Sequence, residues 1–220
     1  MAKGSERRAK ALSKARIVEQ AIAILDAEGE QALTCRALAE RLATGPGAIY
    51  WHIADKAELL EAATSAVVSR ALAAGDDGQE PKTAIRAIAL ELYDAVDAHP
   101  WAGAQFFRAP WQATALQVSE SIGGRLLALG APAHVRFNAW STLLHYILGV
   151  AGQNAANARQ APRDVDRTTF LTAVADRWTQ ADSAAYPFMH EVAAQLPHHD
   201  DRKQFLAGVD LILLGIEASH

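Results

Sequence analysis

Hydrogen-bonding groups and small residues share one short stretch of the chain, TGPGAIYWH, over residues 44–52. Hydroxyl and imidazole groups bond to phosphates and base edges, and an alanine methyl can touch the methyl group of thymine. Small residues also let a helix backbone approach such a surface closely. The residues that we expect to contact nucleic acid here are Thr44, Gly45, Ala48, Tyr50 and His52. For Tyr50 the alternative is packing between this part of the chain and the rest of the protein body, and for Trp51 such packing is our expectation. For His52 the alternative is a plain surface position.

Four more side chains are candidates for holding phosphate groups. Thr34 and Arg36 stand at the expected start of a helix, where free backbone N–H groups already favour anions. Lys56 falls in the first turn of another expected helix, a poor place for a cation unless an anion also binds there. Lys14 belongs to residues 1–16, which carry six basic side chains against one acidic, a net charge of +5. Such a basic end suits a polyanion, although a solvated tail has the same composition.

The spacing of apolar residues predicts the helices that would position these groups. Ser13 can cap a helix with a helical apolar repeat over residues 17–25, and Gly29 would end it. Thr34 can cap a second, short helix, and the turn at residues 44–47 leads into a third. Two short helices joined by a tight glycine-containing turn, behind a longer support helix, form a helix-turn-helix pattern. That pattern places one helix in the major groove of DNA.

The rest of the chain also has a helical pattern. A capping box, Asp55 to Glu58, opens a fourth helix running to about Ala74, and a glycine- and aspartate-rich linker follows it. Further helices are expected near residues 82–98, from Pro110 through Leu129, and near 133–157, 164–180, 187–195 and 201–217. We therefore expect an all-α chain with a helix-turn-helix head of residues 1–60 and a larger helical body of residues 61–220.

Composition narrows the possible classes of protein. The 220 residues include 48 alanines and only 8 prolines, which favours helix. No apolar run has the length of a membrane span, and the basic N-terminus lacks the apolar stretch of a secretory signal, so we expect a cytoplasmic protein without membrane contact. The net charge of −4 argues against a protein that coats nucleic acid with its whole surface. The single cysteine, Cys35, is expected to be half-buried, with a redox switch as the less favoured alternative.

The stretch from Leu12 to Leu60 closely resembles the DNA-binding head of the TetR family of bacterial repressors. The resemblance lies in AIAILDAEGEQALT, in LAERL and in GAIYWHIADKAELL, at the family's spacing. HYILGVAGQ in the long helix and FLAGVDLILLGIE near the C-terminus resemble, more loosely, the body of the tetracycline-repressor subgroup. This implies a homodimer in which these two helices pair with their copies. Two recognition helices related by a two-fold axis imply a palindromic operator of double-stranded DNA.

The body carries many aromatic side chains interleaved with a few polar ones. Such a set fits an apolar cavity that orients a small-molecule effector, and a well-packed dimer domain is the alternative. The candidate effector-binding residues are Tyr93, Phe106, Phe107, Arg108, Trp111, Trp140, His145, Gln153 and Trp178. The resemblance does not extend to the set that holds a tetracycline–metal chelate. His145 matches that set, but Phe107, Ala87 and Gln153 stand where histidine, asparagine and an acidic residue are expected.

An apolar or aromatic effector therefore suits the sequence better than a metal chelate. The run HHDD at residues 198–201 has metal-ligand residue types, but before a helix it suits a solvated turn, so we expect no metal and no cofactor. The chain lacks a Ser-His-Asp order, an HExxH motif and a phosphate-binding glycine loop, so an enzyme is not expected. We expect a repressor that leaves its operator when the effector binds. The alternatives are a dimeric regulator without an effector and an activator of the same fold.

Overall fold

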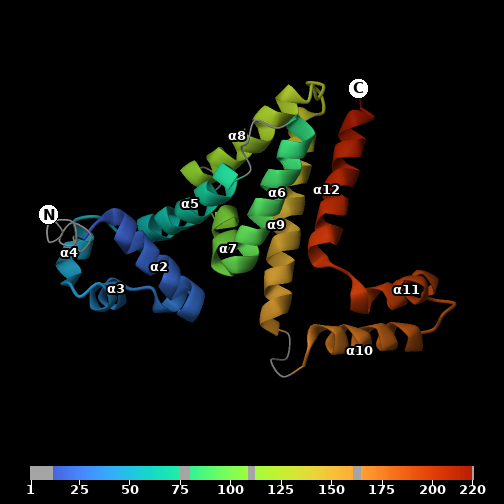
Figure 1. The fold of residues 1–220 in the computed structure, drawn as a ribbon, viewed down its shortest axis with the longest axis horizontal. Helices are drawn as coiled ribbons and strands as arrows, with labels where there is room; N and C mark the ends of the chain where they lie inside the picture. The colour runs from blue at the N-terminus through green and yellow to red at the C-terminus, as the bar shows by residue number, and fades with distance from the viewer. Residues whose placement is uncertain (1–11, 75–79, 109–111, 161–164, 220) are drawn as a thin grey trace, which may run out of the picture.

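The computed structural model describes residues 12–74, 80–108, 112–160 and 165–219, and within these ranges the regular structure is helical throughout. The elements, labelled as in Figure 1, are α2 (Lys14–Glu28), η1 (Glu30–Ala32), α3 (Cys35–Arg41), α4 (Pro46–Tyr50), α5 (Lys56–Ala74), α6 (Pro81–Ala98), α7 (Pro100–Arg108), α8 (Ala113–Ala128), α9 (Arg136–Gln160), α10 (Arg167–Gln180), α11 (Pro187–Val192), η2 (Ala193–His198) and α12 (Asp201–Glu217). The prediction of an all-α chain is confirmed.

Local hydrogen bonds explain where the helices of the head begin. The hydroxyl of Ser13 accepts from the backbone N–H of Arg16 at the start of α2, at 3.3 Å. The first half of the expected capping box is present, since the Asp55 carboxylate accepts from the N–H of Glu58 at 2.8 Å, whereas Glu58 accepts from the N–H of Ala54, one residue before Asp55, at 2.7 Å. Each carboxylate or hydroxyl satisfies a backbone donor that has no partner inside its helix.

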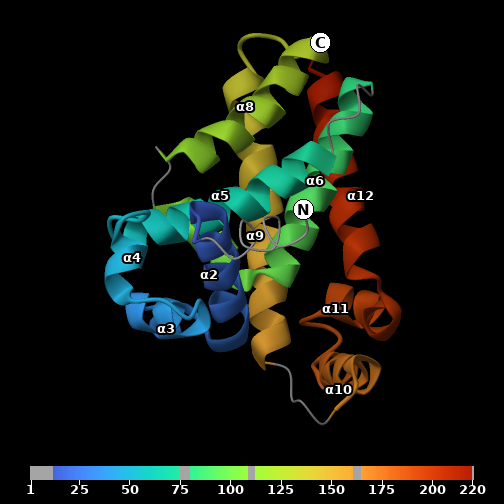
Figure 2. The same cartoon turned by 60° about the vertical axis from the view of Figure 1, so that its left-hand side comes forward.

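Two hydrophobic clusters divide the molecule, and α5 belongs to both. The head cluster joins α2, α3, α4, the first part of α5, including Ala63 and Val67, and the start of α7. The body cluster takes over one residue later, at Val68, and continues to Ala71. Figure 2 shows α5 running from the small helices of the head into the larger body. Helix α5 therefore passes through both clusters as one continuous helix.

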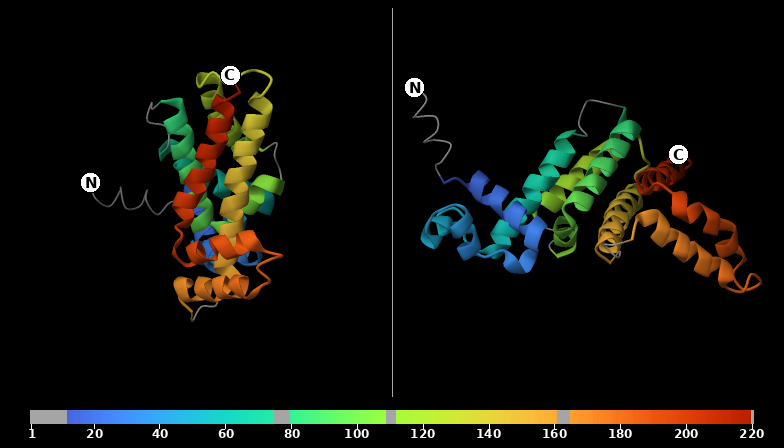
Figure 3. Two further views of the ribbon diagram at one scale, coloured as in Figure 1. Left: turned by 90° about the vertical axis from the view of Figure 1, so that its right-hand side faces the viewer. Right: turned by 60° about the horizontal axis from the view of Figure 1, so that its bottom comes forward.

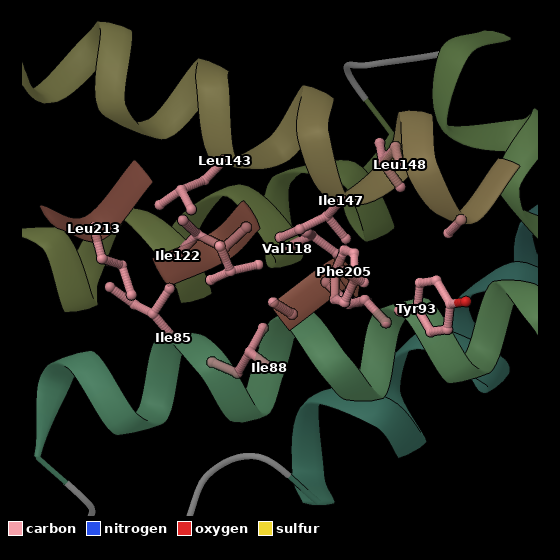
Figure 4. Packing of buried hydrophobic residues seen from close by; sticks show 14 of the residues in the cluster. Ile85, Ile88, Tyr93, Val118, Ile122, Leu143, Ile147, Leu148, Phe205 and Leu213 are labelled. Carbon is pink, nitrogen blue, oxygen red and sulfur yellow. The ribbon is translucent and has the colours of Figure 1, made fainter. Parts of the chain in front are cut away.

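Four helices supply most of the body core. Side chains of α6, α8, α9 and α12 interdigitate in Figure 4, where Ile85, Ile147 and Phe205 lie among them with no exposed surface. The ring of Phe205 stacks on those of Tyr93 and Tyr146, with centroids 4.6 and 5.5 Å apart. Burying aromatic side chains of this size is a large stabilising contribution, on the order of 1.5–3 kcal/mol each.

Ion pairs fasten α6 to α12 along their length. Lys82 near the start of α6 pairs with Glu217 at the end of α12 at 2.9 Å, and Asp94 near the end of α6 pairs with Arg202 near the start of α12 at 2.6 Å. The two helices are therefore antiparallel. Pairs that are this exposed add little stability, so the apolar core and not the ion pairs holds α12 in place.

The segment α10–α11–η2 projects from the rest of the body, as Figures 1 and 3 show from different sides. Its helices pack mainly on one another. Arg167 at its start donates to the carboxylate of Asp201 at 2.8 Å and to the carbonyl of His199 at 3.2 Å. The single helix expected near 187–195 is instead α11 followed by a 3-10 helix that contains Pro197, because proline removes a backbone donor and favours the tighter turn.

Candidate nucleic-acid interface and effector site

The turn between α3 and α4 is tight. Ala43 has a φ of +51°, in the left-handed region that non-glycine residues seldom adopt, and Gly45 caps α4 without a side-chain bond. Pro46 then occupies the first turn of α4, where its missing N–H costs nothing. Ile49 anchors this short helix, because its side chain is fully buried in the head cluster. The arrangement is the helix-turn-helix that the sequence predicts, and it lies at the far end of the molecule from α12 (Figure 1).

Trp51 is the clearest departure from expectation at this site. Its side chain is 89% exposed, so the expected packing of Trp51 against the rest of the chain is wrong. Ile49 and Ile53 both turn into the head core, with 0% and 2% exposure, and Trp51 stands between them on the opposite side. The adjacent Tyr50 is also well exposed, at 57%. Two aromatic rings therefore extend into solvent at the end of α4.

Tyr50 is tied to the start of α3 through Cys35. A hydrogen bond between the two side chains is the first cause of the raised pKa of the Tyr50 phenol. The phenol therefore keeps its proton at neutral pH and can donate to a phosphate oxygen. Cys35 is half-buried, as expected.

The predicted phosphate-binding lysines both contact oxygen atoms of the head itself. Lys14 Nζ pairs with Glu58 Oε1 at 2.7 Å, and Lys56 Nζ donates to the backbone carbonyl of Glu30 at 2.7 Å. The N–H of Ala54 and the ammonium of Lys14 hold the pKa of Glu58 below its usual range, so this carboxylate stays charged. Binding of a phosphate by Lys14 would require it to leave Glu58.

The other predicted contact residues cap a helix, lie exposed on the surface or are half-buried around α4. The hydroxyl of Thr34 caps α3 by accepting from the N–H of Ala37 at 3.1 Å, and Arg36 is exposed and pairs with Glu40 at 3.2 Å. Gly45 is exposed, while Thr44, Ala48 and His52 are half-buried in and around α4. Arg41, which the sequence analysis did not select, ends α3 and pairs with Glu28 of α2 at 2.5 Å. The contacts of these residues with DNA stay predictions.

The predicted effector-binding residues whose side chains the structure describes lie on three helices, α6, α9 and α10. Tyr93 is buried, and its hydroxyl accepts from Asn154 at 2.7 Å. Burial raises the pKa of this phenol. His145 and Gln153 are exposed along α9, and Trp178 lies on the projecting α10. Four others cannot be placed as side chains: Trp111 lies outside the described residues, as do the side chains of Phe106, Phe107 and Arg108 in the last turn of α7.

Two buried donors of the body have no hydrogen-bond partner within the described ranges of the chain. They are the side-chain amide nitrogen of Gln105 on α7 and the indole nitrogen of Trp140 on α9. Gln105 is only 8% exposed. A buried donor without a partner costs roughly 1–3 kcal/mol and needs an explanation such as a bound molecule or water. Sequence reasoning selected Trp140 but missed Gln105, which carries no motif.

Exposed aliphatic side chains mark the outer face of α12. Leu211 and Leu214 are 71% and 55% exposed, whereas Phe205, Val209 and Leu213 of the same helix are buried. Apolar residues on both sides of one helix indicate that a second surface covers α12.

No group of potential ligands in the described part of the chain has a geometry that could hold a metal ion. At residues 198–201, Asp200 caps α12 by accepting from the N–H groups of Arg202 and Lys203, each at 3.0 Å. The acidic helix start expected there is confirmed. No helix among the described residues has the length and apolarity to cross a membrane.

Comparisons with known proteins agree with this geometry. Residues 17–63 match the family described as bacterial regulatory proteins, tetR family, and residues 74–220 match the tetracyclin repressor-like C-terminal domain. An HTH-type transcriptional regulator of Saccharopolyspora erythraea is 28% identical over 211 residues, covering 94% of this chain and 86% of its own.

Solved structures show the same architecture. SCO7222, a TetR transcriptional regulator of Streptomyces coelicolor, superposes with a TM-score of 0.88 at 52% identity, covering 96% of this chain and 100% of that one. ActR of the same organism, in complex with actinorhodin, shares the fold at 21% identity with a TM-score of 0.75, covering 95% and 98% of the two chains. The chain therefore belongs to the TetR family of bacterial regulatory proteins, and it is a DNA-binding transcriptional regulator and not an enzyme.

Proposed function

We propose that this regulator is a repressor that releases a palindromic operator when a small, largely apolar or aromatic effector binds its body. The observation that carries this proposal is the shared helix α5, whose residues lie in the head cluster up to Val67 and in the body cluster from Val68 onward. A ligand that repacks the body cluster acts on the same rigid helix that carries the head. We also propose that it acts in the cytoplasm, because the chromosome that carries its operator lies there.

The unpartnered donors indicate the chemistry of the effector. Gln105 and Trp140 each present a buried N–H that finds no acceptor among the residues that the structure describes. We infer that the effector carries carbonyl or hydroxyl oxygen atoms on an apolar or aromatic frame. ActR was solved in complex with actinorhodin, which supports binding of a small molecule by a protein of this fold.

The quaternary structure is part of the proposal. We propose a homodimer formed through α9 and α12, because Leu211 and Leu214 would otherwise remain in water. We also propose the division into a DNA-binding domain of residues 1–60 and an effector-binding and dimerisation domain of residues 61–220. The two-fold axis would place the α4 helices about 34–36 Å apart, one turn of DNA.

Fluorescence anisotropy tests the operator. A duplex from the region upstream of this protein's own coding sequence is compared with a scrambled duplex at several salt concentrations. We expect the native duplex to bind at least ~10³-fold more tightly, as specific regulators do. Equal, steeply salt-dependent binding to both duplexes would contradict self-regulation, and genome-wide capture of bound DNA would then look for a distant operator.

Thermal-shift screening of oxygenated aromatic compounds tests the effector, because a ligand that binds only the folded state raises the melting temperature. A compound that raises it should also weaken operator binding by about 5–150-fold, and operator DNA should weaken binding of the compound equally. Equal affinity of a bound compound for the free and the DNA-bound protein in calorimetry would favour the regulator without an effector switch. Transcription in vitro from the operator's promoter distinguishes a repressor from an activator.

A further inference from the structure

One carboxylate of the head accepts two hydrogen bonds from the body. The indole N–H of Trp101 donates to Asp26 Oδ1 at 2.7 Å, and Nδ1 of His99 lies 2.8 Å from the same oxygen. Asp26 stands near the end of α2, the support helix of the DNA-binding head. His99 and Trp101 flank Pro100 at the corner between α6 and α7.

The corner that supplies these donors is rigid and belongs to the body. Proline fixes the backbone at the first residue of α7. Helix α7 also lies very close to α6, because a Cβ placed on Gly103 would come within 2.9 Å of Val96. Val96 is itself part of the body core. The corner is therefore fastened to the body through α6.

Trp101 also reaches into the head. Its ring is only 8% exposed, and together with Ala102 it packs in the hydrophobic cluster of the head. The indole N–H therefore points at Asp26 while the ring is packed among apolar side chains. This packing fixes both the distance and the angle of the hydrogen bond. The side chains of Asp26 and His99 are 33% and 25% exposed, so water competes only partly for the shared oxygen.

We propose that Asp26 is a positioning residue for DNA binding, which fixes the orientation of the head on the body by holding the corner formed by His99, Pro100 and Trp101. Helix α5 connects the two regions covalently, but one helix leaves the head free to rotate about that helix. A second attachment, where the end of α2 meets the start of α7, removes this freedom. In a dimer it keeps the two α4 helices at one separation, as two half-sites require.

Distances between the two heads of the proposed dimer test this role directly. A spin label is attached to Glu19→Cys, on the exposed face of α2, in a Cys35→Ser background that removes the single native cysteine. We expect a narrow distribution of label distances in the parent and a broad one in Asp26→Ala. Asp26→Asn, which keeps the accepting oxygen, should stay narrow. Trp101→Phe, which keeps the ring and removes the donor, should broaden the distribution and replaces Asp26→Ala if that variant fails to fold.

Binding to the operator is the second measurement. Asp26→Ala and Trp101→Phe should lose roughly tenfold in affinity for the operator and little for a scrambled duplex, since loose heads still meet phosphates but seldom two half-sites together. A loss of stability alone would not change this ratio far below the melting temperature. Glu28→Ala is the matched control: it removes a carboxylate from the same helix end, but that carboxylate pairs with Arg41 inside the head.

The positioning role is overturned if the label distances in Asp26→Ala or Trp101→Phe are distributed as narrowly as in the parent and the ratio of affinities for operator and scrambled duplex is unchanged. Broadening in Glu28→Ala to the same degree would also overturn it. If the parent itself does not discriminate between the duplexes, the operator assignment fails, but the distance measurement still decides the role of Asp26.

Discussion

The end of α4 and the outer face of α12 both expose large side chains, but of different chemistry. Tyr50 and Trp51 are aromatic, and each carries a group that can donate a hydrogen bond. Leu211 and Leu214 are purely aliphatic. An amphipathic ring suits a wet, charged partner such as DNA, whereas a leucine gains only from leaving water. The two surfaces therefore suit the two proposed partners, DNA at one end and a second copy of the chain at the other.

The largest expected effect comes from charging the aliphatic surface. Leu211→Glu with Leu214→Glu would bring four carboxylates into the proposed dimer interface, where burial of unpaired charge is very costly. We expect a monomer in sedimentation analysis and a loss of at least ~100-fold in operator affinity, because a monomer meets only one half-site. A dimer of unchanged strength would show that α12 does not face the second copy.

Leu116→Glu is the control for that experiment. Leu116 is 59% exposed, close to the 55% of Leu214, but it lies on α8. The control should remain a dimer and bind the operator normally. A monomer here would mean that any charge on an exposed leucine of the body disrupts assembly, and the assignment of the interface to α12 would lose its support.

The aromatic surface should behave in the opposite way. Trp51→Ala should leave the dimer intact and weaken operator binding roughly tenfold, because the exposed ring can pack on sugars or thymine methyl groups of the duplex and donate its N–H to a phosphate oxygen. Anisotropy measures the affinity, and far-UV circular dichroism should show an unchanged fold, since the ring packs on little of the protein. Full affinity in Trp51→Ala would mean that the ring is exposed for some other reason.

The sequence predicts those features of the fold that depend on interactions between residues close together in the chain. The caps at Ser13, Thr34 and Asp55 depend on backbone groups within three residues, and all three are present. Trp51 was harder to predict, because a helix of five residues is too short for a periodic pattern to show which face is buried. The contact of Asp26 with Trp101 joins residues 75 positions apart, and no local pattern reports such a pair.

A smaller effect is expected at Lys56. Its ammonium donates to a neutral carbonyl, so its charge is still available to a phosphate. Lys56→Ala should weaken binding to all duplexes alike and lower the slope of log affinity against log salt by about one. Tyr50→Ala should also act on all duplexes alike, but without the change in slope, because the lost group is neutral. An unchanged slope in Lys56→Ala would remove Lys56 from the phosphate contacts.

The smallest effect, and the only gain, is expected at Glu58. Described head residues 12–60 carry five basic and seven acidic side chains, so the folded head is not a cationic surface. Glu58 holds Lys14 in an exposed pair worth at most about 1 kcal/mol, which limits the gain in affinity from Glu58→Gln to roughly fivefold. Glutamine can still accept from Ala54, so the start of α5 is kept. If the gain comes from releasing Lys14, it should shrink in a Lys14→Met background. An equal gain in both backgrounds would instead mean that Glu58 repels phosphates directly and that Lys14 does not reach the DNA.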